Sequence, residues 1–243
     1  MSYPNYLIKN YTITTNQIDA YDDLSMVGIL DVFQDIAGRH AYLIKAGFND
    51  MLDLGFYWVI ARNQVKIIKT PPFGHDVKVK TWPLAPTRFY FDRLYELRDE
   101  NGEVCVLGRS RWLIIDKDKR KMQASSMYQY PLTEFVTQND FDKDFPSIRV
   151  VKEKEVSELT HIVLPSEIDH NKHFNNTRYA ELIYNVLGID HKDSISEFLI
   201  YYHSECYLGD QIDVYVEIEN KDYYVSGYSK GNLVFTSLVT KRE

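Results

Sequence analysis

The chain has 243 residues, enough for one large domain or two small ones, and 44% of them are hydrophobic, which suffices for a buried core. Its net charge of −7, from 35 acidic and 28 basic residues, makes it a poor candidate for binding nucleic acid. No apolar run reaches the roughly 18 residues of a membrane span, and two cysteines, Cys105 and Cys206, favour a reducing cytoplasm over a disulfide framework.

The first half of the chain predicts one helix followed by antiparallel strands. Residues 17–38 begin with a polar turn, continue with apolar residues at helical spacings of three and four, and stop at Gly38, a candidate C-cap. Strand patterns follow in YWVIARNQVKII and FGHDVKVKTWPL, and then comes a hairpin that turns at Asn101-Gly102. One helix with a meandering sheet buries its apolar surface when the sheet wraps around the helix.

The second half repeats this order after a polar stretch, 133–158, that is predicted to be a linker. Residues 167–188 align with 17–38 without gaps, and strand patterns and a hairpin at Lys230-Gly231 follow. We therefore expect an N-terminal half at 1–132 and a C-terminal half at 159–243, with the two sheets joined edge to edge.

The two copies differ in the turn before the helix, which reads DHNKHFNN from Asp169 to Asn176 in the second copy. Asn171 aligns with Tyr21 and His173 with Asp23. The first half therefore keeps the scaffold but lacks the polar set, that is, the side chains of Asn171 and His173. One interpretation is a polar turn with a capped helix start, for which Asn175, Asn176 and Thr177 are suitable residues.

Two chemical interpretations compete with the polar turn. A metal site could use Asp169, His170 and His173 with Glu205 or Cys206, but no second cluster has ligand spacing. A catalytic site could use Asp169, Asn171 and His173, because alternate residues of an extended segment share one face. Free N–H groups at the following helix start would then stabilise an oxyanion.

Residues 201–210 supply a second candidate pair, Glu205 and Cys206. In a regular strand these side chains point to opposite faces, so only one can enter the site unless a bulge intervenes. A carboxylate in an aromatic strand requires a partner, whereas a free Cys is usually a small buried hydrophobe.

These residues resemble those of the acyl-acyl carrier protein thioesterases, the plastid and bacterial enzymes that release free fatty acids. IDHNKHFNNTRY resembles the family's D-x-N-x-H-x-N-N-x-x-Y motif, SEC resembles its Glu-Cys pair, and GILDVFQDIAGRHA resembles its first helix. The resemblance covers nearly the whole chain. It implies an α+β double hotdog fold, in which two long helices are each wrapped by half of a shared antiparallel β-sheet.

The resemblance also implies hydrolysis of the thioester between a fatty acid and the phosphopantetheine arm of acyl carrier protein, which terminates fatty acid synthesis. By motif position it assigns catalytic roles to Asp169, Asn171, His173, Glu205 and Cys206, with either Cys206 or an activated water as nucleophile. We prefer water, with backbone N–H groups near Asn175 and Asn176 holding the oxyanion. Neither a cofactor nor a metal is expected.

The first half lacks the polar set, so we expect it to bind the acyl chain, with Phe33 and Trp58 among the lining residues, although core packing is the simpler role for each. Acyl carrier protein is acidic, so docking requires a local basic patch. The candidates are the basic residues of the first half's strands and turns: Lys66, Lys69, Lys78, Lys80, Arg109, Arg111, Lys117, Lys119, Arg120 and Lys121.

The N-terminal sequence has neither a signal-peptide core nor a transit-peptide composition, which favours a bacterial cytoplasmic enzyme. Two rival functions remain: a hotdog thioesterase that acts on acyl-coenzyme A, and a non-catalytic fatty-acyl binding protein. Sheet-edge pairing would allow a homodimer, although no residue requires one.

Overall fold

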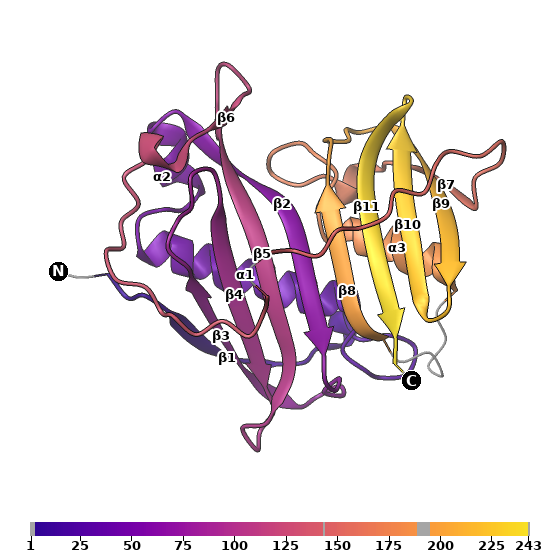
Figure 1. The fold of residues 1–243 in the computed structure, drawn as a ribbon. Helices are drawn as coiled ribbons and strands as arrows, with labels where there is room; N and C mark the ends of the chain where they lie inside the picture. The colour runs from indigo at the N-terminus through magenta and orange to yellow at the C-terminus, as the bar shows by residue number, and fades with distance from the viewer. Residues whose placement is uncertain (1–2, 143, 189–194, 243) are drawn as a thin grey trace. The chain divides into compact units, whose positions relative to one another are not determined.

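The computed structural model describes residues 3–142, 144–188 and 195–242. The chain divides into two compact units, Met1–Lys143 and Asp144–Glu243, and each is an antiparallel sheet with a helix against one face (Figure 1). None of the described helices is long and apolar enough to cross a membrane.

Unit 1 has a five-stranded sheet in the order β1-β3-β4-β5-β2, with the short β6 paired to β5. Its strands are β1 Leu7–Thr12, β2 Phe56–Ile67, β3 Asp76–Pro83, β4 Phe91–Arg98, β5 Val104–Asp116 and β6 Met122–Gln123. Its helices are α1 Met26–Leu43 and α2 Phe48–Asp53, with short 3-10 turns at Thr15–Gln17 and Ser125–Met127.

Unit 2 has the same topology, because its order β7-β9-β10-β11-β8 repeats β1-β3-β4-β5-β2 strand for strand. Its elements are β7 Leu159–Ile162, a 3-10 turn Pro165–Glu167, α3 Arg178–Leu187, β8 Ile195–Tyr202, β9 Gln211–Glu219, β10 Asp222–Ser229 and β11 Asn232–Lys241. The predicted internal repeat is therefore confirmed at the level of whole elements.

The two copies differ in where their helices end. Gly188 adopts a left-handed conformation with φ of 55° and its N–H donates to Tyr184 O, so its prediction as a C-cap is confirmed. The same prediction is wrong for Gly38, because α1 continues to Leu43 and spans 18 residues against 10 in α3. The buried face of α1 extends past Gly38 to His40, which is fully buried. Packing of this face therefore favours a helix that continues beyond Gly38.

The stretch predicted as the linker forms neither helix nor strand in its described parts, 133–142 and 144–158. It is nevertheless anchored by aromatic side chains in both units. Phe141 packs with Trp82 and Leu94 in unit 1, and Phe145 packs with Leu199 and Tyr201 in unit 2. The linker is therefore polar in overall composition, yet one of its aromatic residues packs against each unit and holds the linker there.

Candidate functional site

The turn before α3 is held closed by one carboxylate oxygen. Asp169 Oδ1 accepts hydrogen bonds from the backbone N–H groups of Asn171 and His173, at 2.8 and 3.1 Å, and Asp169 O accepts one from Lys172. Lys172 takes a φ of 67°, in the left-handed region typical of tight turns. The prediction of an extended segment with three side chains on one face is therefore wrong, because the Asp169 side chain offers the backbone a more compact arrangement.

The segment after β8 lies against this turn. Strand β8 ends at Tyr202, so the prediction that Glu205 and Cys206 lie in a regular strand is wrong. The N–H of Phe174 donates to Cys206 O at 2.8 Å and joins the segment to the turn. The two side chains still diverge: Glu205 faces His173, and Cys206 points into the core with 1% of its surface exposed.

His173 and Glu205 face each other across this contact. His173 Nε2 lies 3.4 Å from Glu205 Oε2, with 14% and 33% of the two side chains exposed. The Tyr207 hydroxyl donates to the same oxygen, Glu205 Oε2, at 2.8 Å, and the Tyr207 ring packs edge-on against His173 with centroids 5.1 Å apart. A partly exposed carboxylate, an imidazole and a phenol therefore meet at one point, and such a set of groups can perform general acid–base chemistry.

Two hydrogen-bond donors, one in this turn and one before the start of α3, have no partner among the residues that the structure describes. One is the Asn171 side-chain amide. The other is the backbone N–H of Asn176, whereas the N–H groups of its neighbours Phe174, Asn175, Thr177 and Arg178 are all engaged. Asn175 Oδ1 accepts from Thr177 N, so the Asn175 side chain shapes the loop before the helix and the Asn176 backbone supplies the donor.

Cys206 is placed for packing. Its thiol lies beside the hydroxyls of Tyr179 and Ser229, and burial raises the pKa of the Cys206 thiol. A nucleophilic cysteine requires the opposite, a lowered pKa and access to the substrate. Both observations favour the water mechanism over a thiolate.

Phe33 and Trp58 belong to the core of unit 1. Phe33 stacks on Tyr95 at 4.5 Å between ring centroids, and it lies so close to Gly108 that a Cβ there would be 2.2 Å from the Phe33 ring. Trp58 donates from Nε1 to Ala46 O at 2.9 Å. Core packing accounts for these contacts, so contact with an acyl chain stays a prediction for both residues.

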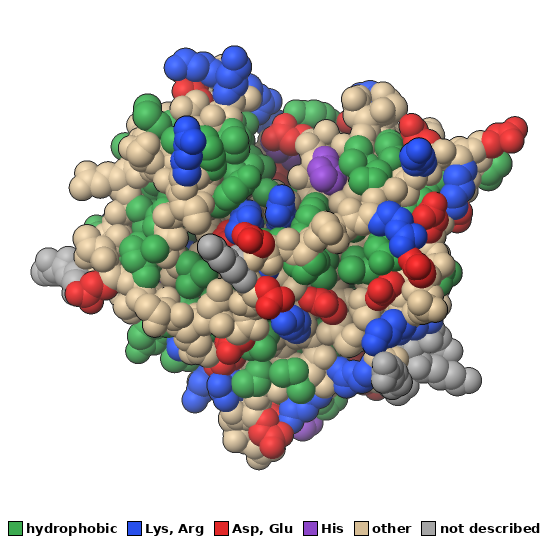
Figure 2. Space-filling view, viewed as in Figure 1, with side chains coloured by type: hydrophobic (Ala, Val, Ile, Leu, Met, Phe, Trp, Pro, Cys, Tyr) green, Lys and Arg blue, Asp and Glu red, His purple; other side chains and the backbone are tan. Residues whose placement is uncertain are grey.

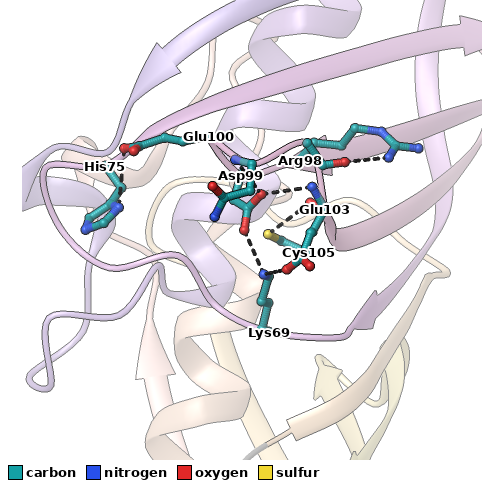
Figure 3. Close-up of polar contacts among 9 residues, drawn as sticks. Lys69, His75, Arg98, Asp99, Glu100, Glu103 and Cys105 are labelled. Atoms are coloured by element: carbon teal, nitrogen blue, oxygen red, sulfur yellow. Dashed lines mark hydrogen bonds and ion pairs between the residues drawn. The ribbon is translucent and has the colours of Figure 1, made fainter.

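The candidate docking cations include residues that a partner protein cannot reach. Arg109 and Arg111 are only 2% and 8% exposed, so they are wrong candidates for a docking patch. Figure 3 shows Lys69 between Asp99 and Glu103, with Nζ 2.7 and 2.5 Å from the two carboxylates. The charge of Lys69 is therefore largely offset within unit 1.

The turn between β5 and β6 carries four of the candidate cations, Lys117, Lys119, Arg120 and Lys121. Residues 117–121 read KDKRK and are all exposed, and Figure 2 shows basic side chains gathering over this turn. Met122 and Met127 follow with 46% and 61% exposed. The turn thus combines positive charge with apolar surface.

Among the described residues, no group of three or more His, Cys, Asp or Glu side chains is placed to hold a metal ion. Tyr207 was missed from the sequence. Its available signal was its position, a phenol two residues after the candidate carboxylate.

Two family models match the chain: the acyl-ACP thioesterase N-terminal domain over residues 4–127, and the acyl-ACP thioesterase C-terminal domain over residues 150–234. The chloroplastic palmitoyl-acyl carrier protein thioesterase of Arabidopsis thaliana is 24% identical over 212 residues, and the oleoyl-acyl carrier protein thioesterase 1 of the same plant is 23% identical over 230. These alignments cover 82% and 86% of the chain but only 52% and 61% of the relatives.

Solved structures match over the whole chain. An acyl-ACP thioesterase from Bacteroides thetaiotaomicron has a TM-score of 0.87 at 22% identity, covering 98% of both chains. A 12:0-ACP thioesterase from Umbellularia californica has a TM-score of 0.83 at 17% identity, covering 99% of this chain and 98% of that one. These likenesses confirm the predicted α+β hotdog fold.

Proposed function

Because the chain belongs to the acyl-ACP thioesterase family, we propose that it hydrolyses the thioester of a fatty acyl-acyl carrier protein and releases the free fatty acid. The observation that carries the proposal is the pairing of His173 with Glu205 at 3.4 Å, on a turn whose first-half copy lacks the polar set. The plant relatives act, by name, on palmitoyl- and oleoyl-acyl carrier protein, which supports the same substrate class here.

In the proposed reaction Glu205 is the general base. It takes a proton from water as the water oxygen bonds to the thioester carbon, and the carbon–sulfur bond then breaks. His173 gives a proton to the departing phosphopantetheine sulfur and regains one as Glu205 is restored. Asp169 is assigned a positioning role in this scheme, because its Oδ1 accepts hydrogen bonds from two backbone N–H groups and so holds the turn.

The oxyanion that forms on the thioester oxygen needs hydrogen-bond donors. The Asn176 N–H and the Asn171 side-chain amide are proposed for this role, because neither has a partner among the described residues. Cys206 is not part of the proposed reaction, since its thiol is buried.

The proposed partner is acyl carrier protein, docking on the basic turn 117–121, where opposite charges would attract the acidic carrier. We further propose a bacterial, cytoplasmic enzyme of fatty acid biosynthesis, a location that the two unpaired cysteines favour. A homodimer stays a prediction.

The test is release of free fatty acid from acyl carrier protein loaded with several chain lengths, compared with the matching acyl-coenzyme A. Wild type, His173→Ala and Glu205→Gln would be measured beside Asp23→Ala, which changes the position equivalent to His173 in the first half. We expect release from the carrier-protein substrates by wild type and Asp23→Ala, and a loss of about a hundredfold or more in the two site variants.

Other outcomes would select a rival function. Faster release from acyl-coenzyme A would identify a coenzyme A thioesterase of the same fold. Acyl chains that bind without release from either substrate would identify a fatty-acyl binding protein.

A further inference from the structure

The turn that begins at Tyr207 is closed by a carboxylate. Asp210 Oδ2 accepts a hydrogen bond from the Tyr207 backbone N–H at 3.0 Å, and the Asp210 N–H donates to Tyr207 O at 3.0 Å. Gly209 takes a φ of 81°, in the left-handed region, and its N–H donates to Val163 O at the end of β7. The side chain and the backbone of Asp210 therefore both hold the backbone from which the Tyr207 phenol reaches Glu205.

The other oxygen of this carboxylate pairs with the hairpin turn between β10 and β11. Lys230 Nζ lies 2.6 Å from Asp210 Oδ1, with 72% of the lysine side chain and 12% of the aspartate side chain exposed. The hydrogen bond from Lys230 lowers the pKa of Asp210 below its ordinary value, so Asp210 is a charged acceptor at neutral pH. One carboxylate thus joins this hairpin to the segment that carries Glu205 and Tyr207.

The first half contains a counterpart of this turn before β3. Gly74 has a φ of 80°, close to that of the glycine in the second copy, and β3 begins two residues later, as β9 does. The His75 N–H donates to Pro72 O, which repeats the backbone bond across the second turn. His75 therefore occupies the position of Asp210, and Pro72 occupies that of Tyr207.

Both copies join this turn to the next hairpin, with acid and base exchanged. Figure 3 shows His75 facing Glu100 of the turn between β4 and β5, and His75 Nδ1 lies 3.4 Å from Glu100 Oε1. The link between turn and hairpin is therefore part of the shared scaffold. The second copy adds a phenol and a backbone N–H bonded to the carboxylate, since Pro72 has neither a hydroxyl nor an N–H.

We propose that Asp210 is a positioning residue, which fixes Tyr207 and, through its phenol, the proposed general base Glu205. Lys230 holds the carboxylate in place. The Tyr207 hydroxyl donates to Glu205 Oε2 at 2.8 Å and the ring packs against His173, so a shift of this backbone moves a contact of both groups. Small displacements of groups at a reacting centre reduce turnover strongly. The expected effect on turnover rests on the proposed hydrolysis, whereas the placement of Tyr207 is measurable without it.

The first measurement is fatty acid release by wild type, Asp210→Ala, Tyr207→Leu and the double variant. Asp210→Ala removes the acceptor of the Tyr207 N–H, so kcat should fall by about fivefold with KM unchanged. In the Tyr207→Leu background, where the phenol and the ring are already absent, the same change should lower kcat by less than about twofold. Equal losses in the two backgrounds would show that Asp210 acts independently of Tyr207, and would overturn the proposal.

Further variants separate the carboxylate from the ion pair. Asp210→Asn keeps an acceptor oxygen and should stay within about twofold of wild-type kcat. The exchange of Asp210→His with Lys230→Glu introduces the pair of the first half, and should lower kcat as Asp210→Ala does, because the carboxylate acceptor is lost. The first half shows that this turn accommodates a histidine, so the exchange also serves if Asp210→Ala does not fold. Wild-type kcat in the exchanged variant would overturn the proposal.

The matched control is Glu100→Gln, which weakens the equivalent link in the first half. It should leave kcat unchanged, because no phenol is held by that turn. A loss equal to that of Asp210→Ala would indicate a general effect on the scaffold and would overturn the proposal.

The placement of Tyr207 is followed independently of turnover through the His173 ring. The two rings pack edge-on with centroids 5.1 Å apart, so the proton–carbon NMR signals of the histidine rings, assigned with His173→Gln, report this contact. Asp210→Ala should move the His173 signal in the same direction as Tyr207→Leu, and Glu100→Gln should leave it in place. An unmoved signal in Asp210→Ala would overturn the proposal. If the signal moved as expected while wild type released no fatty acid, the proposed hydrolysis would fail and the placement of Tyr207 by Asp210 would stand.

Discussion

Asp19 and Asp169, 150 positions apart, close two copies of the same turn with the same carboxylate oxygen. Asp19 Oδ1 accepts from Tyr21 N at 2.9 Å and Asp23 N at 3.2 Å, as Asp169 Oδ1 accepts from the N–H groups of Asn171 and His173. The backbone bond between the ends of the turn is 2.9 Å in both copies. The shared acid is thus part of the scaffold, and the side chains that differ between the copies are the ones available for chemistry.

Replacing each acid with Ala should separate structure from catalysis. Asp19→Ala and Asp169→Ala each remove one acceptor of two backbone N–H groups, so each should lower the free energy of unfolding by about 1 kcal/mol. Only Asp169→Ala should lower kcat, because it releases the turn that carries His173. Urea unfolding and fatty acid release would be measured on both. Loss of turnover in Asp19→Ala, at unchanged fold, would contradict this division.

Tyr207→Phe tests the phenol that holds Glu205. The variant keeps the ring that packs on His173 and removes the hydrogen bond to Glu205 Oε2. We expect kcat to fall by about fivefold with KM unchanged, since the bond orients the base and does not bind substrate. Tyr207→Leu removes the ring as well, so its kcat should fall further. A rise in KM with constant kcat would instead make Tyr207 a substrate-binding residue.

Cys206→Ala tests the nucleophile. The thiol is 1% exposed and its pKa is raised by burial, so turnover should stay within about twofold of wild type. The cavity should lower the free energy of unfolding by about 1 kcal/mol. In the native wild type, iodoacetamide should react slowly with this thiol. An inactive but folded Cys206→Ala would restore the thiolate mechanism.

The repeat and the strand order could be predicted from the sequence, because alternation, Gly turns and helical spacing are local signals. The turn at Asp169 could not, since it depends on a side chain that bonds to its own backbone two and four residues on. The residue at which α3 begins could not be predicted either, because the start of each helix depends on how closely it packs against the preceding turn. The first copy shows this dependence. A Cβ at Gly28 would lie 2.3 Å from Gln17 O, so α1 runs close to the turn only because this residue is glycine.

The equivalent position in the second half is Arg178, and α3 begins only there, two residues later than α1. The delay leaves Asn176 outside the helix. No local spacing signals this difference. The position of the helix start in the second half thus depends on which residue stands at one position of the repeat.

Charge reversal in the basic turn tests docking of the carrier protein. The double variant Lys119→Glu with Arg120→Glu should raise KM for acyl-acyl carrier protein by about tenfold, and should weaken the salt dependence of kcat/KM. Hydrolysis of acyl-pantetheine, which lacks the carrier protein, should not change. Lys78→Glu reverses one exposed cation on β3, outside the proposed docking turn, and should leave KM near wild type. An equal effect of both changes would indicate long-range charge rather than docking.

His40 should make the stability of the protein fall at acidic pH. Its pKa of about 4 in the folded state lies below the ordinary value of 6.5, so the unfolded chain binds a proton in this interval and the folded chain does not. Stability is therefore fully present above pH 6.5 and is lost as pH falls toward 4, by up to about 3 kcal/mol. His40→Gln keeps a hydrogen-bonding side chain that does not titrate, and its free energy of unfolding should change less between pH 7 and pH 4. Parallel pH profiles for the two proteins would show that His40 takes up a proton as readily in the folded chain as in the unfolded chain, and would contradict this prediction.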